Sequence, residues 1–131
     1  MNRLMTASFF TFKGPGRVSI ARTQPKGVCV PSYRQLAPGP WYRTAEQWEY
    51  RRLYFAQLAR LNPAQVVQDL EALAGGATPV LLCWETLKKP GEWCHRRMVA
   101  EWLETELGLI VPEHGASGQA KKEPPEQGGL F

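Results

Sequence analysis

The segment CWETLKKPGEWCHRR, residues 83–97, places two thiols, a carboxylate, an imidazole and two guanidinium groups within a short stretch of chain. It begins at the end of an apolar run and leads into a segment with helical periodicity. A helix N-terminus presents free N–H groups and a partial positive charge, which favour a bound anion and lower the pKa of a thiol placed there. The pattern therefore makes Cys94 a candidate nucleophile beside an anion-binding position.

The other polar residues of this segment allow more than one interpretation. Glu85 can act as a general base or bind a ribose hydroxyl or a base edge. Cysteine and histidine are also zinc ligands, but the segment lacks a Cys-x2-Cys pair, and Cys94 and His95 are adjacent, so we expect no metal site. A plainer alternative stays open, in which Cys83 is a core residue, His95 bonds to the backbone and the arginines are solvated.

Hydrophobic periodicity and turn residues outline the elements around this segment. The sequence predicts two strands, a long loop, two helices, a strand, a helix and a last strand. In order, they are residues 6–12 and 17–21, the loop 22–44, a helix capped by Thr44 and ending near Leu61, a helix capped by Asn62 and ending at Gly75, the strand 79–83, a helix ending at Gly108, and the strand 109–111. This order predicts an α/β domain with a mostly parallel sheet, a central strand at 79–83 and a right-handed crossover to 109–111. In such sheets ligands bind at the carboxyl ends of the strands, so Glu85 and the Cys94 helix start should face each other.

Length and composition set the broader class. A chain of 131 residues has room for one domain, here residues 1–114, followed by a disordered tail, residues 115–131, that is rich in Gly, Pro and charge. Three cysteines do not suggest a disulfide framework, and no run is long enough to span a membrane, so we expect a cytoplasmic protein without a membrane partner. Residues 1–60 hold ten Lys and Arg against two Glu, whereas the remainder holds six against ten acidic residues. The basic first half favours anionic partners such as nucleotides or nucleic acid.

A family resemblance covers roughly residues 7–113. The runs SFFTFKGPGRVSIARTQPKG, YRQLAPGPWY and LNPAQVVQDLEALAGGATPVLLCWE, followed by CHRRMVAEWLE, resemble a small single-domain branch of the bacterial and phage proteins of the domain-of-unknown-function 488 family. The resemblance implies Rossmann-like, three-layer α/β architecture and a shared polar cluster. The positions that match the family are Ser19, Arg22, Pro25, Tyr33, Leu36, Ala37, Pro38, Cys83, Glu85, Cys94, His95 and Arg96.

The family's association with phage genomes and nucleic-acid metabolism points to nucleotide or modified-base chemistry. The first hypothesis is a pocket that binds or processes a nucleotide or nucleic-acid base without a further cofactor. Its residues would be Glu85, Cys94 and His95 as catalytic candidates and Arg22, Arg96, Ser19 and Tyr33 as anion or ligand contacts. In the long loop, Tyr33, Trp41 and Tyr42 lie among Arg34 and Arg43 and are candidate stacking surfaces for bases, although packing of these rings against the core is the plainer alternative. The alternative is a non-catalytic nucleic-acid or protein interaction module, and the sequence does not decide whether the protein is an enzyme.

The chain ends in EQGGLF, in which Gln127, Leu130 and Phe131 have the spacing Gln-x-x-Leu-Phe. This spacing is similar to the short peptides by which bacterial polymerases and repair proteins dock on the DNA sliding clamp. A tail with one amide and two apolar anchors suits a preformed pocket. The motif predicts a sliding clamp as a partner.

Overall fold

Three short parallel strands form the sheet, in the order β1-β3-β2. The computed structural model describes residues 3–89 and 91–115. The strands are β1 (Met5–Ser8), β2 (Arg17–Ser19) and β3 (Val80–Cys83), and β3 pairs in parallel with both of its neighbours. The α/β class and the central place of residues 79–83 are therefore confirmed, with strands one to three residues shorter than expected.

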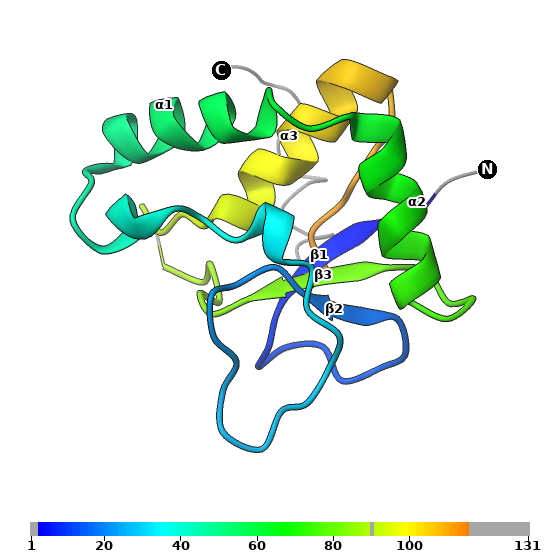
Figure 1. Cartoon of the computed structure of the whole chain (residues 1–131). Coiled ribbons are helices and arrows are strands. Elements are labelled where there is room, and N and C mark those ends of the chain that lie inside the picture. The colour runs from blue at the N-terminus through cyan, green and yellow to red at the C-terminus, as the bar shows by residue number, and fades with distance from the viewer. Residues whose placement is uncertain (1–2, 90, 116–131) are drawn as a thin grey trace.

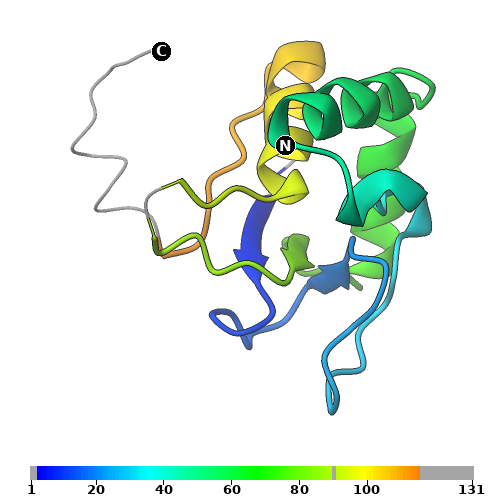
Figure 2. The ribbon, with the colours of Figure 1, turned by 90° about the vertical axis from the view of Figure 1, so that its left-hand side faces the viewer.

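Three helices lie on one side of the sheet, as Figures 1 and 2 show. They are α1 (Gln47–Leu58), α2 (Pro63–Leu73) and α3 (His95–Leu107). Their buried side chains share one core with Val18 and Leu81 of the sheet and with Ile20, which follows β2. The opposite face of the sheet buries Ala7, Phe9, Val80 and Leu82 under loop side chains such as Phe12, Val28 and Val30. Loops thus supply the third layer.

The alternation of side chains along β3 decides where its last residue points. Val80 and Leu82 face the loop layer, whereas Leu81 faces the helices. Because successive side chains of a strand point to opposite faces, Cys83 follows Leu81 to the helix side. There it meets the N-terminus of α3, and the strand end and the helix start that carry the candidate residues lie together.

Local signals explain the borders of α2 and α3. The Asn62 side chain accepts a hydrogen bond from the Gln65 N–H at 3.1 Å, and Pro63 occupies the first turn, as the sequence predicts. Helix α3 ends at Gly108, whose φ of 71° lies in the left-handed region that glycine adopts without strain.

The predicted cap of α1 is wrong. Thr44 has the helical angles φ −109° and ψ −20°, because it closes the 3₁₀ helix Pro40–Arg43 with a bond from its N–H to the Trp41 carbonyl. An N-cap needs an extended backbone, which Glu46 has, and α1 begins at Gln47. The rest of the long loop is irregular except for a second 3₁₀ turn, Arg34–Leu36.

The predicted last strand at 109–111 is also wrong. The chain reaches the sheet slightly later, where Glu113 forms a single parallel bridge with Thr6 on the outer edge of β1. Ile110 is 82% exposed, and Pro112 has no N–H to extend a ladder. The crossover from β3 through α3 therefore ends in a bridge.

None of the helices within the described residues is long and apolar enough to cross a membrane. The predicted tail lies outside the described residues apart from Gly115.

Candidate functional site

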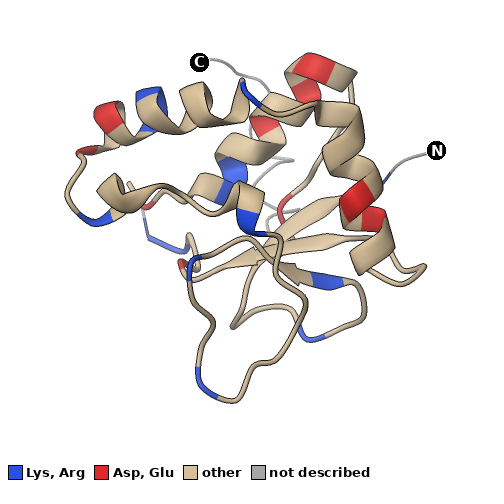
Figure 3. Cartoon of the chain, viewed as in Figure 1, with Lys and Arg blue, Asp and Glu red and all other residues tan. Residues whose placement is uncertain are grey.

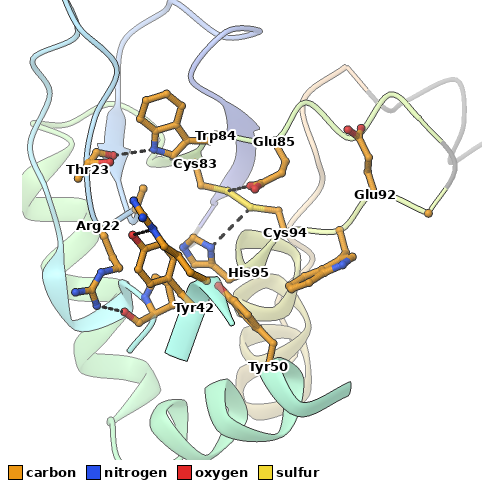
Figure 4. Close-up of a pocket in the computed structure, with 15 residues that line it drawn as sticks. Arg22, Thr23, Tyr42, Tyr50, Cys83, Trp84, Glu85, Glu92, Cys94 and His95 are labelled. Carbon is orange, nitrogen blue, oxygen red and sulfur yellow. Dashed lines mark hydrogen bonds between the residues drawn. A yellow bond between two sulfur atoms is a disulfide. The ribbon is translucent and has the colours of Figure 1, made fainter. Parts of the chain in front are cut away.

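A pocket of about 710 Å³ opens where β3 ends and α3 begins. Figure 4 shows its labelled residues arriving from the long loop after β2, the first turn of α1, the end of β3 with the loop that follows it, and the start of α3. Of the predicted site residues, the lining includes Arg22, Glu85, Cys94 and His95. The structure thus brings together the catalytic candidates and one of the anion contacts.

The two cysteines of the segment form a disulfide between Cys83 and Cys94, although the sequence gave no reason to expect a disulfide. Both are almost fully buried at the base of the pocket, with 1% and 3% of their surface exposed. Cys94 is the N-cap of α3 and makes no side-chain capping bond. Cys29, by contrast, is a free and exposed cysteine.

His95 is buried next to this pair, and its two ring nitrogens have different partners. Nε2 lies 2.7 Å from the Ile20 carbonyl, and Nδ1 lies 3.8 Å from Sγ of Cys94. A carbonyl can only accept, so Nε2 carries the proton and donates, which leaves the Nδ1 lone pair facing the sulfur. Burial lowers the pKa of His95 to about 4, with Arg96 contributing in the same direction. The ring is therefore neutral at pH 7.

The remaining lining has two groups of side chains. One is cationic and aromatic and comes from the loop before α1, and the other comes from the loop that follows β3. Arg22 donates to the Pro38 carbonyl at 2.8 Å and stacks 4.8 Å from the ring centre of Tyr42. Arg43 donates to the Tyr42 hydroxyl at 2.8 Å, so two guanidinium groups flank one aromatic ring. The half-exposed indole of Trp84 donates to the carbonyl of Thr23, the neighbour of Arg22, at 3.1 Å.

Glu85 is the exposed carboxylate beside Trp84. One of its oxygens lies 3.8 Å from Sγ of Cys83. Burial, and then the charge of Glu85, raise the pKa of the Tyr50 hydroxyl, so this tyrosine stays protonated. Tyr50 also packs edge-on against Trp93, with ring centres 4.7 Å apart.

Three predicted ligand contacts are not among the residues that line this pocket. Arg96 is completely buried, because its guanidinium forms two bonds to Glu113, at 2.9 and 2.7 Å, and a third to Sγ of Cys83 at 3.1 Å. Ser19 is buried in β2 and accepts from the Ala21 N–H. Tyr33 is buried and donates its hydroxyl to an Asp69 oxygen at 2.7 Å.

Sequence reasoning also missed residues that do line the pocket. Trp84 and Trp93 belong to the segment that drew attention first, but only their positions in space make them pocket residues. Tyr50 has the helical spacing of a core residue, and no local signal distinguishes it from one. The tail residues Gln127, Leu130 and Phe131 lie outside the described residues.

A parallel α/β fold with a polar cluster at the end of its central strand is the arrangement that the family resemblance implied. Residues 14–107, well over half of the chain, match the family model described as "Active DUF488-N3 subclade". The chain therefore belongs to the DUF488 family, through its DUF488-N3a branch. No curated protein and no solved structure is similar enough to the chain to count as a match.

Proposed function

We propose that the pocket binds a nucleotide or a nucleic-acid base. We further propose that the reduced form of the protein processes this ligand. The observation that carries this proposal is that Arg22 and Arg43 both lie against the ring of Tyr42, in the same pocket lining as Trp84 and Glu85. A volume of about 710 Å³ is within the range of small-molecule sites. Flat aromatic faces suit a base, and guanidinium groups suit a phosphate.

Each part of such a ligand has a matching group in the lining. Arg22 uses one nitrogen on the Pro38 carbonyl and retains further N–H donors for a phosphate. Glu85 is exposed and accepts hydrogen bonds, so it suits a ribose hydroxyl or an exocyclic amino group. The half-exposed face of Trp84 is a stacking surface for a ring.

Processing, as opposed to binding, depends on the groups at the base of the pocket. In the disulfide, Cys94 has no thiolate to act as a nucleophile. His95 is neutral and its Nε2–H is bonded to a carbonyl, so only Nδ1 is available to accept a proton. Catalysis by Cys94 therefore requires the reduced protein, with Glu85 as the exposed acid or base.

The test is a calorimetric titration of the full chain with nucleoside monophosphates, free nucleosides and inorganic phosphate. Because a charge-assisted bond contributes roughly 1.5–3 kcal/mol, Arg22→Gln and Arg43→Gln should each weaken nucleotide binding by about tenfold or more. Arg60→Gln is the matched control, since Arg60 is exposed and lies outside the pocket lining. Equal loss in all three variants, or no binding by the wild type, would refute the proposal.

The alternative is a non-catalytic module that uses the basic loop for nucleic acid and the tail for a DNA sliding clamp. Figure 3 supports this alternative, because Lys and Arg are distributed along the loop between β2 and α1, whereas Asp and Glu gather on α2 and the last turns of α3. Such a module would bind single-stranded oligonucleotides with a steep salt dependence and without a need for Glu85. Glu85→Gln therefore distinguishes the two functions.

The clamp contact is tested by a pull-down with and without residues 127–131. Retention of the full chain alone supports the contact, and equal retention of both forms excludes it.

A further inference from the structure

Three buried side chains at the base of the pocket point metal-binding atoms at one another. We propose that the reduced protein binds a zinc-type cation through Cys83, Cys94 and His95, with a fourth position open to the pocket. The two sulfurs and a ring nitrogen of His95 all lie within 4.8 Å of one another, and all three residues are buried. Two thiolates and one imidazole are a typical donor set for zinc.

The distances suit a tetrahedral ion. With zinc–sulfur bonds of about 2.3 Å and zinc–nitrogen bonds of about 2.1 Å, a sulfur and a nitrogen on one tetrahedral ion lie about 3.6 Å apart, and two sulfurs about 3.8 Å. Sγ of Cys94 and Nδ1 of His95 are 3.8 Å apart. The Cα atoms of Cys83 and Cys94 are 7.5 Å apart, beyond the usual disulfide range of roughly 4.4–6.8 Å. The backbone therefore leaves room for the sulfurs to separate around an ion.

The adjacency of Cys94 and His95, which argued against a metal in the sequence, does not prevent ligation in the fold. Cys94 is the N-cap, with the extended angles φ −152° and ψ 147°, whereas His95 is the first residue of α3. The change of backbone direction at this border brings the two side chains to the same point. Adjacent residues inside a helix would diverge around its axis.

The surrounding contacts already orient and activate these donors. The Nε2–H of His95 donates to the Ile20 carbonyl at 2.7 Å, which is the second contact that metal-binding histidines usually make. It fixes the tautomer in which Nδ1 has its lone pair free. Arg96 places Nη1 3.1 Å from Sγ of Cys83 and is itself held by Glu113, so a thiolate at Cys83 has a fixed cationic donor.

The disulfide is the oxidised, metal-free form of the same site. A dithiol reductant supplies two electrons and two protons, so the sulfur–sulfur bond breaks, two thiols form and the reductant becomes a disulfide. Binding of the cation then releases the two thiol protons to solvent. In the oxidised protein neither Cys83 nor Cys94 can supply a thiolate, so this site is absent.

Three protein donors leave one position for water, as in catalytic zinc sites. Glu85 lines the pocket within 3.8 Å of Sγ of Cys83, so it is placed to accept a proton from a water in that position. With the cation bound, Cys94 is a ligand and not a free nucleophile, so this water takes the place of the Cys94 thiolate. Only the identity of the substrate that the water attacks rests on the proposed nucleotide function, and the metal site itself does not depend on it.

The test uses cobalt(II) and zinc on the full chain, reduced and then freed of reductant without air. We expect one equivalent of cobalt, a thiolate-to-cobalt charge-transfer band, the visible spectrum of a tetrahedral ion, and displacement by zinc. The oxidised protein should show none of these. Native mass spectrometry of the wild type should find one zinc in the reduced form and none in the oxidised form, and a reduced wild type without metal would overturn the proposal.

Variants assign the donors. Cys83→Ser, Cys94→Ser and His95→Gln should each weaken cobalt binding by about tenfold or more, with the sulfur band reduced in the two serine variants. Cys29→Ser is the matched control, because Cys29 is exposed and apart from the pocket, and it should bind like the wild type. Loss of the band in Cys29→Ser, with retention in Cys94→Ser, would place the metal elsewhere.

Azide tests the open position. A shift of the cobalt spectrum on adding azide supports a water-bearing site, and an unchanged spectrum refutes that part. Nucleotide binding is titrated with the oxidised protein in the presence of a chelator, where no metal is bound. Failure of nucleotide binding and failure of metal binding can therefore be told apart.

Discussion

The buried ion pair between Arg96 and Glu113 gives a quantitative test of the structure. The Arg96 side chain has no exposed surface and that of Glu113 has 11%. Two nitrogens of Arg96 donate to the two Glu113 oxygens at 2.9 and 2.7 Å, and the Thr6 hydroxyl donates to one of them at 2.6 Å. The perturbation is Glu113→Gln, which removes the negative charge and keeps the shape.

The expected loss follows from the burial of the charge that remains. Removing one partner of a buried pair costs roughly 3–5 kcal/mol, because the other charge stays in the interior without compensation. Glutamine retains one acceptor oxygen, so we expect the lower end, about 3 kcal/mol. A loss of this size is a large part of the total stability of a small domain.

The chain offers a matched control in Glu101→Gln. Glu101 accepts two bonds from Arg51, at 2.9 and 2.5 Å, but the two side chains are 49% and 50% exposed. An exposed pair of the same type contributes roughly 0.2–1 kcal/mol because water screens it. The two substitutions therefore differ mainly in burial.

Urea unfolding at pH 7, monitored by tryptophan fluorescence, measures the free energy of unfolding of each variant. The comparison holds when the slope of this free energy against urea concentration is the same as in the wild type. The reasoning is refuted if the two variants lose stability by amounts within about 0.5 kcal/mol of each other. In that case Arg96 would not be an enclosed charge, and its predicted role as an anion contact would regain support.

Three further results are expected. Burial lowers the pKa of His95 from 6.5 to about 4, so on acidification the unfolded chain takes up a proton at this residue before the folded chain does. The stability of the folded state that depends on neutral His95 is therefore complete above pH 6.5 and is lost as the pH falls towards 4. The loss at pH 5 is about 2 kcal/mol, and His95→Gln, compared with the wild type with the disulfide intact in both, should lack this part of the pH dependence in urea unfolding. Gly16→Ala should lower the thermal midpoint far more than Gly75→Ala, because both have positive φ but only the first new Cβ would meet a backbone oxygen, at 2.0 Å; equal shifts would contradict this. Without reductant, iodoacetamide should label Cys29 alone, and mass spectrometry that finds three labels on the folded protein would contradict the disulfide.

Several features were predictable because the signals for them are local. Asn62 followed by Pro63 starts α2, and Gly108 ends α3, since each residue acts on backbone groups within a few positions of itself. The proximity of the β3 end and the α3 start was predictable for the same reason. Cys83 and Cys94 lie on either side of one short connection, so a strand end and a helix start could be placed together from sequence alone.

The misassigned features depend on contacts between distant residues. Thr44 has the right type for a cap, but the preceding 3₁₀ turn sets its backbone. Tyr33 and Arg96 have the right types for ligand contacts, but their polar atoms are already bonded to Asp69 and Glu113. Residue type does not show whether a polar group will find its partner in a ligand or within the fold.

The sequence by itself determined the α/β class, the central strand, the helix that follows it and the family to which the chain belongs. Those properties follow from periodicity, caps and short connections, which act over a few residues. Only the tertiary structure decided which polar groups face the pocket, because that depends on pairs such as Thr6 with Glu113, which are 107 positions apart. The same long-range packing turned Cys83, Cys94 and His95 from three separate side chains into one cluster of donors.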